Sequence, residues 1–451
     1  MKEITSLFEE ERQLLLQALS EPGFSLIQLS GKVGVGIPDF LRQSLSAYEA
    51  AILNMQQLPL SGQQKYWAYY FPELENSEFA DFFKDLAGLY KEKQGILVLL
   101  NYQNLIKSCP KLEQLIRKSI REDFKESNLK LIIVEEYGSE QAREKSLARG
   151  FYKQMAGLSL GFYPLNYLES MQFLAHWPAE DRLYGYSISG GYYDYLLKLA
   201  KYQNLDELLL EEFCSPNGEL QSLPERVLAS KLREPALYQM ELQAMAEGAK
   251  RQKEIAEAAA LPPSSAANYL RVLLELGLIE KRQAYRNNNP RLIRYFIADP
   301  VFRFVFYFLY KLDPLRQRGL LDECLEIIKD KLDDYFHQDF IEIAREYLLN
   351  LREQGELPND IDDFAPWWNE PDQQIDLLGS NADTAVLAAC KWSAEKASMA
   401  DFEELKERGR LTQRRKHKLY LIFSKSGFSQ ELLEFAEGTA DLYLVSLFGE
   451  A

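Results

Sequence analysis

The chain has 451 residues, 47% of them hydrophobic and 27% charged, a globular composition long enough for about three domains. Its net charge of −16 excludes a uniformly basic nucleic-acid binder, so any contact with nucleic acid requires a local basic surface. The four cysteines and three histidines are scattered without metal-ligand spacing, which argues against a zinc site and a disulfide framework and predicts no metal centre.

The first 20 residues have the pattern of an acidic amphipathic helix and not that of a signal peptide. No uncharged apolar run in the sequence reaches transmembrane length. Together with the cysteine usage, these features predict a cytoplasmic protein without a membrane partner.

A glycine-rich turn follows the apolar, strand-like run that begins at Phe24 and precedes a helical pattern that ends at Leu45. The spacing Gly31-x-x-x-x-Gly36 fits the first six positions of the phosphate-binding loop GxxxxGK[ST], in which backbone N–H groups hold phosphates. Ile37 and Pro38 stand where that motif has a lysine and a hydroxyl. The candidate nucleotide loop, in degenerate form, comprises Gly31, Gly34, Gly36, Ile37 and Pro38. An ordinary glycine-rich turn is the alternative.

Apolar runs at 95–100 and 129–135, each preceded by a helical pattern (79–93 before the first), predict two buried strands. Alternating strands and helices predict a parallel sheet covered on both faces. In an active P-loop ATPase the second apolar strand ends in Asp-Glu, and here it ends in Asn101-Tyr102. Further on, the pair Gly190-Gly191 before an aromatic run predicts a turn that starts a helix.

Residues 226–300 have the pattern of a winged helix: a helix at 252–261, a turn at 262–265 with a serine N-cap, a helix at 266–276 and a hairpin that ends at Ile297. Twelve Lys and Arg against eight Asp and Glu give this unit a charge of +4, whereas the rest of the chain carries −20. Such a local reversal favours a DNA contact. The candidate DNA-binding residues are Arg271, Lys281, Arg282, Arg286, Arg291 and Arg294. A winged helix that serves only packing or dimerisation is the alternative.

The C-terminal part opens with an aromatic helix, 301–310, which predicts core rather than a ligand site. Two later strand patterns carry Asp376 and then Lys391, an arrangement similar to the metal-binding core of restriction nucleases. Ala389 cannot bind a metal, so Asp376 and Lys391 are interpreted as a remnant nuclease-like site or as a structural ion pair. A second basic cluster, Arg410, Arg414, Arg415, Lys416 and Lys418, could meet DNA or pair with an acidic segment such as 356–363.

These elements, in this order, resemble the prokaryotic, archaeal-type P-loop ATPase family, which joins a P-loop domain, a winged helix and a restriction-nuclease-like domain of unknown function (number 234). The matching phrases are Gly31 to Gly36, Ser189 to Leu196, Glu254 to Glu257, Leu276 to Leu278, Arg294 to Phe304, Cys390 to Trp392 and Phe423 to Phe428. The chain departs from the family at Ile37, Pro38, Asn101 and Tyr102, at Gln374 and Ala389, and at Ile341, where Glu342 follows the position of the usual glutamate.

The resemblance implies an α/β multidomain fold with a P-loop NTPase-like parallel sheet and helical extension (1–225), a winged helix (226–300) and a restriction-nuclease-like α/β domain (301–451). Because the departures fall on the chemistry, the sequence predicts no catalytic residue and no cofactor, and a regulatory or scaffolding role with DNA, a protein partner or a second copy of the chain. The competing hypothesis is a switch-type ATPase that still binds ATP and Mg²⁺ and hydrolyses ATP.

Overall fold

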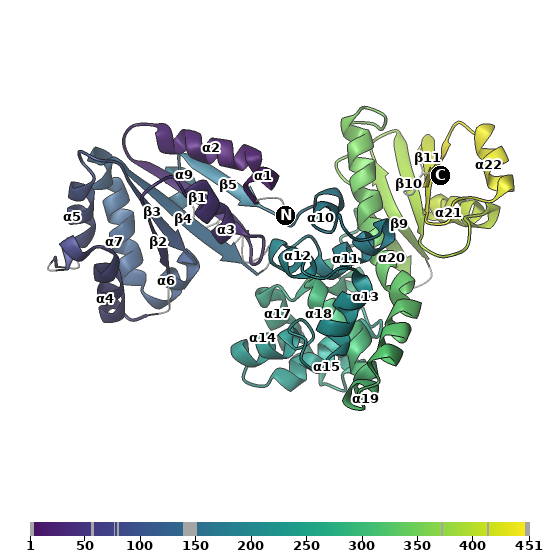
Figure 1. Cartoon of the computed structure of the whole chain (residues 1–451). Helices are drawn as coiled ribbons and strands as arrows, with labels where there is room; N and C mark the ends of the chain where they lie inside the picture. Colours follow the sequence, from purple (N-terminus) through teal and green to yellow (C-terminus); the bar gives the residue numbers. More distant parts are fainter. Residues whose placement is uncertain are drawn as a thin grey trace. The chain divides into compact units, whose positions relative to one another are not determined.

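The computed structural model describes residues 4–55, 58–75, 77–78, 81–138, 151–370, 373–412 and 415–446 (Figure 1). The chain divides into two compact units, each of which is described by itself. The first comprises Met1–His176, Ser189–Tyr202 and Glu275–Leu278, and the second comprises Trp177–Ile188, Gln203–Leu274 and Ile279–Ala451.

The first unit is built on a five-stranded sheet in the order β2-β3-β4-β1-β5. All of its neighbouring strands are parallel, which confirms the predicted parallel sheet. The central strands β3 and β4 are almost wholly buried because they are continuous apolar runs. The strands are β1 (Ser25–Lys32), β2 (Ala50–Asn54), β3 (Gly95–Leu100), β4 (Leu129–Tyr137) and β5 (Leu158–Phe162).

Helices pack on both faces of this sheet (Figure 1). The amino-terminal helix is split into α1 (Ile4–Leu7) and α2 (Glu9–Ser20), and α3 (Ile37–Ser44) follows the glycine-rich loop. The helix expected over 79–93 is α5 (Phe82–Leu89); residues 79 and 80 lie outside the described residues. The remaining helices are α4 (Leu60–Tyr70), η1 (Pro72–Leu74), α6 (Tyr102–Ser108), α7 (Pro110–Arg121), η2 (Phe124–Glu126), α9 (Phe151–Met155), α10 (Tyr167–Phe173) and α12 (Tyr193–Leu199).

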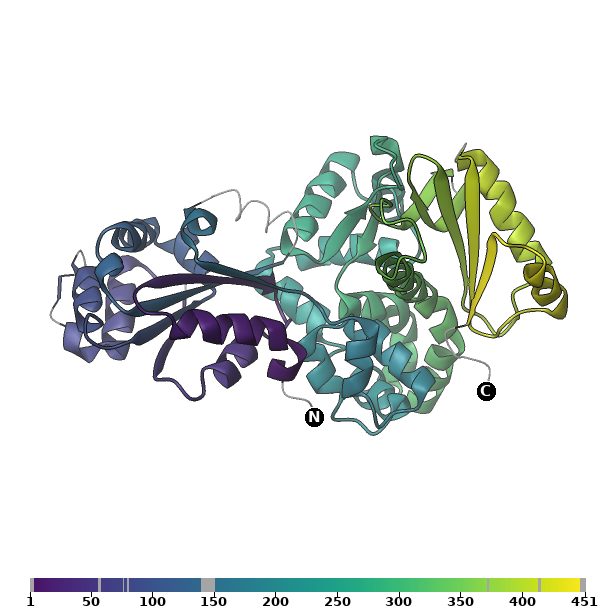
Figure 2. The ribbon, with the colours of Figure 1, turned by 90° about the horizontal axis from the view of Figure 1, so that it is seen from above.

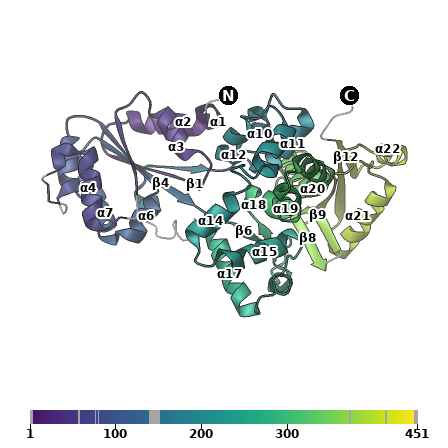
Figure 3. The same cartoon turned by 60° about the horizontal axis from the view of Figure 1, so that its bottom comes forward.

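The second unit contains the winged helix, whose parts α15, α17 and β6 are labelled in Figure 3. The hairpin strands β6 (Ile279–Arg282) and β7 (Arg294–Ile297) are antiparallel, as predicted. The expected serine N-cap is wrong, because α17 (Pro263–Leu276) begins at Pro263, whose fixed φ and missing N–H suit a first helical position. The other helices of this part are α13 (Leu205–Leu208), η3 (Leu209–Cys214), α14 (Leu223–Lys231), α15 (Pro235–Ala246) and α16 (Gln252–Ala258).

The aromatic segment after the winged helix forms core, as predicted: Phe302, Phe304 and Phe306 are at most 1% exposed. It runs through α18 (Pro300–Phe304), the π-helical turn η5 (Val305–Leu309) and α19 (Tyr310–Gln317). The 33-residue helix α20 (Leu321–Glu353) follows. Helix α11 (Ala179–Ser189), which comes earlier in the chain, also contacts this helix through side chains described below.

The C-terminal sheet has the order β12-β11-β10-β9-β8, and Figure 2 shows it edge-on beside its helices. Strands β10, β11 and β12 are parallel, whereas β9 is antiparallel to both β8 and β10. Its elements are β8 (Ala365–Glu370), β9 (Gln373–Ser380), β10 (Thr384–Lys391), β11 (His417–Ser424), β12 (Leu442–Ser446), α21 (Met399–Thr412) and α22 (Gln430–Glu437). The α/β multidomain class predicted from the sequence is confirmed.

Candidate functional site

The glycine-rich loop joins β1 to α3, as predicted for a strand, loop and helix frame. Gly34 and Gly36 have φ angles of 91° and 89°, in the left-handed region that side chains disfavour, so glycine is required at both. Gly36 is the N-cap of α3, and Pro38 lies within the first helical turn, where its missing N–H breaks no helical bond.

Apolar side chains pack against the glycines of this loop. Ile37 is fully buried, and its Cδ1 lies 2.9 Å from the point where a Cβ on Gly31 would stand. The Val35 Cγ2 is equally close to that point. On the other side, Ile4 and the ring of Tyr193 lie against Gly36. Apolar side chains therefore pack against both the first and the last glycine of the loop.

Carboxylates gather beside the loop. The Asp194 N–H donates to the Gly34 carbonyl (3.1 Å), and burial together with the charge of Asp39 raises the pKa of Asp194. Burial, followed by the charge of Asp194, raises the pKa of Glu136 to about 7. Asp39 forms an ion pair with Arg42. Negative charge at this position opposes the binding of a phosphate.

Strand β3 ends in a structural turn. Asn101 has a φ of 54° and its amide donates to the Asn54 side chain (3.0 Å). Tyr102, at the position of the ATPase glutamate, is fully buried and its hydroxyl hydrogen-bonds that of Tyr152. Tyr152 also donates to Glu113 (3.2 Å). Tyr102 thus belongs to the core.

The double glycine starts helix α12, as predicted. Gly190 and Gly191 both have positive φ, and a Cβ on Gly191 would collide with the Leu165 carbonyl. The turn delivers Tyr193 to Gly36, so two stretches that stand far apart in the sequence meet at the loop.

The six candidate DNA-binding residues of the winged helix divide into two groups. Arg271, Lys281 and Arg291 are exposed. The Arg271 guanidinium donates to Asn268 one turn away on α17 (2.9 Å), and the Lys281 ammonium lies 5.7 Å from the ring centre of Tyr295. These three side chains present positive charge to solvent.

Arg282, Arg286 and Arg294 point instead to the C-terminal part of the same unit. Arg282 pairs with Glu280 (2.6 Å) and Glu342 (3.6 Å), and Arg286 pairs with Asp362 (3.4 Å). Arg294 stacks its guanidinium 4.4 Å from the ring centre of Trp368. The pairing with Asp362 agrees with the alternative that basic residues meet the acidic segment 356–363.

The candidate nuclease-like residues do not pair with each other. Lys391 donates to both carboxylate oxygens of Asp401 on α21 (3.2 and 3.3 Å), while Asp376 accepts the backbone N–H of Cys390 (2.8 Å). The predicted Asp376–Lys391 ion pair is therefore wrong, because the carboxylate nearest to Lys391 comes from the following helix. Burial raises the pKa of Asp376.

The second basic cluster is only partly described, because Arg414 lies outside the described residues. Arg415 donates to the Ala382 carbonyl (3.3 Å) and Lys418 to the Gly409 carbonyl (2.9 Å). Arg410 and Lys416 are exposed.

Two ionic clusters around α20 were missed by the sequence reasoning. Arg303 donates to Asp339 (2.6 Å) and to the Ser187 hydroxyl (3.2 Å). In the second cluster, the Lys425 ammonium contacts Asp333 (2.7 Å) and Glu180 (2.6 Å). Arg303 and Lys425 lie in the phrases Arg294 to Phe304 and Phe423 to Phe428, which carry the family resemblance. Their place in these phrases is the sequence feature that could have indicated the two clusters.

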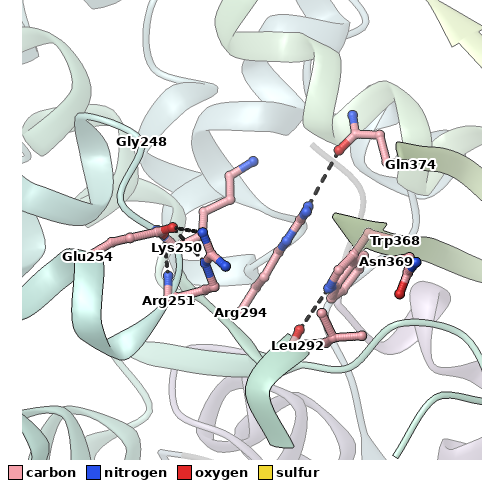
Figure 4. Close-up of a pocket in the computed structure, with 9 residues that line it drawn as sticks. All are labelled: Gly248, Lys250, Arg251, Glu254, Leu292, Arg294, Trp368, Asn369 and Gln374. Atoms are coloured by element: carbon pink, nitrogen blue, oxygen red, sulfur yellow. Dashed lines mark hydrogen bonds and ion pairs between the residues drawn. The ribbon is translucent and has the colours of Figure 1, made fainter. Parts of the chain in front are cut away.

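The described residues also contain a pocket between the wing and strands β8 and β9 (Figure 4). Its lining residues are Gly248, Lys250, Arg251, Glu254, Leu292, Arg294, Trp368, Asn369 and Gln374. The sequence did not reveal it, because these residues come from three separate stretches.

Among the described residues, no group of three or more His, Cys, Asp or Glu side chains is arranged to hold a metal ion. The four cysteines are buried free thiols. No helix in the described ranges is long and apolar enough to cross a membrane.

Two family models match segments in the second half of the chain. Residues 305–404 match a family of archaeal and bacterial proteins of unknown function, domain number 234. Residues 242–283 match the IclR-type helix-turn-helix domain. Both matches agree with the resemblance inferred from the sequence, and the second supports a helix-turn-helix at α16 and α17.

Similarity extends over most of the chain. An uncharacterised protein of Methanocaldococcus jannaschii is 25% identical over 395 residues, 85% of this chain and 86% of that protein. A Walker-type ATPase of Pyrococcus abyssi is 17% identical, with 66% of this chain and 95% of that chain covered and a TM-score of 0.46. The ORC2 protein of Aeropyrum pernix is 16% identical, with 69% and 93% covered and a TM-score of 0.44.

Proposed function

We propose that the chain is a non-catalytic protein with a P-loop ATPase-like sheet, acting in the cytoplasm as a regulator or scaffold that contacts DNA through its winged helix. The observation that carries the non-catalytic part is Ile37: at the position of the phosphate-binding lysine stands an apolar side chain that is fully buried against Gly31. The core position of Tyr102 supports the same conclusion, because the ATPase glutamate that orients water stands at this place.

The electrostatics of the loop point the same way. An active P-loop ATPase offers its ligand a lysine and a hydroxyl from the loop and a Mg²⁺-binding carboxylate from the end of the second apolar strand. Here these positions hold Ile37, Pro38 and Asn101, and the neighbouring charges come from Asp39 and Asp194. Each replacement removes a separate contact with nucleotide, so the losses add.

Calorimetric titration of the full chain with Mg-ATP tests this proposal. We expect no binding at the loop tighter than about millimolar and no turnover, because the charge-assisted contacts are missing. A micromolar dissociation constant, or hydrolysis that Gly36→Val abolishes, would instead favour the switch-type ATPase.

The DNA contact is proposed for Arg271, Lys281 and Arg291, which are exposed on α17 and the wing. The helix-turn-helix match at 242–283 supports it. Arg282, Arg286 and Arg294 are assigned to contacts within the unit, because each contacts a residue of the C-terminal part: Glu342, Asp362 and Trp368, respectively. Fluorescence anisotropy with a random-sequence duplex at low salt tests the contact. If no binding is seen at tens of micromolar protein, only the scaffolding role remains. The winged helix would then bind a partner protein or a second copy of the chain.

The remnant nuclease-like site is proposed to be inactive as well. Lys391 is neutralised by Asp401, and Ala389 offers no ligand to a divalent cation. Asp376→Asn should change stability and leave no metal-dependent activity to lose. Mn²⁺-dependent nicking of DNA that disappears in Asp376→Asn would contradict this.

A further inference from the structure

The pocket between the wing and the C-terminal sheet has a volume of roughly 200 Å³ and lies within the second unit. The segment before α16 contributes Lys250 and Arg251, the end of the wing contributes Arg294, and β8 and β9 contribute Trp368 and Gln374. Figure 4 shows that the side chains of Lys250 and Arg251 extend beside Arg294, with Trp368 on its far side.

Positive charge exceeds negative charge in this pocket: three cationic side chains face one carboxylate among its lining residues. That carboxylate, Glu254, already accepts from the Arg251 guanidinium (2.6 Å) and from the backbone N–H groups of Arg251 (2.9 Å) and Lys250 (3.1 Å). Within the described ranges, neither the Lys250 ammonium nor the Arg294 guanidinium forms an ion pair. Two cations are therefore left without a counter-charge.

Arg294 is held in place before any ligand arrives. Its guanidinium lies 4.4 Å from the ring centre of Trp368, and one of its nitrogens donates to the Gln374 side chain (3.4 Å). Trp368 is 3% exposed and is itself fixed by the hydrogen bond from its indole N–H to the Leu292 carbonyl (2.7 Å). A preorganised cation loses little side-chain entropy on binding, which favours affinity.

The cations crowd one another. Burial, then the charges of Arg294 and Arg282, lowers the pKa of Lys250. Burial, then the charge of Arg251, lowers the pKa of Arg294. A bound anion would relieve this repulsion, and the binding of such an anion would raise both pKa values.

We propose that this pocket binds a phosphate group. Arginine presents a planar pair of donors that matches the oxygens of phosphate, and lysine adds a compact positive charge. The volume accommodates a phosphate with part of the molecule that carries it. The group comes from a small phosphate compound or from the end of a nucleic-acid strand, and the site is independent of the loop at 31–36.

Titration calorimetry of the full chain with inorganic phosphate, at ionic strength held constant with chloride, tests the pocket. We expect saturable binding that Lys250→Gln weakens about tenfold or more, because it removes one charge-assisted contact. Lys250 keeps accessible surface although the pocket partly desolvates its ammonium, so this variant should fold. The matched control is Lys253→Gln, three residues further on in α16. Its ammonium pairs with Glu257 (3.7 Å) and does not line the pocket, so the variant should change the affinity less than about twofold.

The absence of saturable binding by the wild-type chain, or equal affinity in Lys250→Gln and the wild type, would overturn the proposal. A 5′-phosphorylated oligonucleotide and its unphosphorylated counterpart then identify the source of the group. Tighter binding of the phosphorylated strand than of free phosphate, with sensitivity to Lys250→Gln, supports a strand end. Equal affinity for the phosphorylated strand and free phosphate, again with sensitivity to Lys250→Gln, supports a small phosphate compound.

The same variants separate this pocket from the loop. Binding of ATP that disappears in Lys250→Gln belongs to the pocket and leaves the non-catalytic proposal intact. Binding of ATP that persists in Lys250→Gln and disappears in Gly36→Val contradicts the non-catalytic proposal. The phosphate titration alone then decides whether the pocket binds phosphate.

Discussion

Glu241 is a carboxylate placed where a carboxylate costs stability. It lies on α15 with no exposed surface, and neither of its side-chain oxygens has a hydrogen-bond partner among the described residues. Burial raises its pKa to about 8, so the folded chain keeps it neutral at physiological pH. At physiological pH, unfolding of the winged helix therefore releases the proton of the Glu241 carboxyl group.

Glu241→Gln should therefore make the stability less dependent on pH. The contribution of protonated Glu241 is fully present below the pKa of an unfolded glutamate and is lost as the pH rises to about 8, by at most about 1.4 kcal/mol per pH unit. Urea denaturation at pH 6 and pH 9 should show Glu241→Gln more stable than the wild type at both values, with the larger difference at pH 9.

The control for this titration is Glu234→Gln, an exposed residue at the start of the same helix. It should leave the pH dependence of the wild type unchanged. A wild-type pH dependence that Glu241→Gln retains in full would show that Glu241 does not carry this proton.

At the scale of the elements, α20 is the helix to which the rest of the second unit attaches. Arg303 of α18 and Ser187 of α11 both donate hydrogen bonds to Asp339 of α20. Lys425, which follows β11, forms ion pairs with Asp333 of α20 and with Glu180 of α11. The Trp392 indole also donates to Asp333 (2.9 Å), and Lys425 lies 5.0 Å from the Trp392 ring centre. The C-terminal sheet is thereby fixed to the helix by charge as well as by packing.

Lys425→Met should destabilise the second unit by about 2–4 kcal/mol, because it leaves Asp333 and Glu180 without their cation in a partly buried place. Adding Asp333→Asn should recover part of this loss. Denaturant unfolding of both variants measures the effect. Lys331→Met, on the exposed side of α20, removes only surface pairs and should cost less than about 1 kcal/mol; an equal cost for the two lysines would contradict the argument.

The elements that the sequence predicted best are those with one strong pattern. Strands β3 and β4 are continuous apolar runs, and the wing strands are bounded by a turn rich in asparagine, so their type and place followed directly. Helix ends were less secure: proline and serine both favour the start of α17, and proline took the first position.

The candidate sites depend on contacts between distant segments, which no local pattern encodes. Lys391 pairs with Asp401 because α21 folds back over the end of β10, and the strand pattern carries no sign of that return. The phosphate pocket joins Lys250, Arg294 and Trp368, which belong to different elements. The loop was the exception, since Gly31, Gly36 and Ile37 are adjacent in the sequence and the structure kept them together.

At the scale of the whole molecule, the charge of −16 opposes DNA, so any binding must arise locally on the winged helix. Each phosphate contact contributes about 0.9 to the slope of log K against log salt. The double variant Lys281→Gln/Arg291→Gln should lower that slope by up to about two, because both side chains are exposed.

The matched comparison is Arg282→Gln/Arg286→Gln, which removes the same charge from residues that already have carboxylate partners. We expect a smaller change in slope from this pair. Anisotropy titrations of a random duplex over a series of salt concentrations measure both, and a larger effect of the ion-paired arginines would reverse the assignment of the DNA-facing surface.

In the proposed non-catalytic protein, the Ile37 side chain that packs against Gly31 makes the stability of the loop independent of nucleotide. A loop that binds nucleotide is stabilised by a free energy that grows with the logarithm of the nucleotide concentration. The stability of such a loop therefore changes with the nucleotide concentration in the cell. The Ile37 side chain is covalently part of the chain, so its contact with Gly31 does not depend on the concentration of any metabolite. Fluctuations in nucleotide level would then leave this loop equally folded in a starved cell and a growing one.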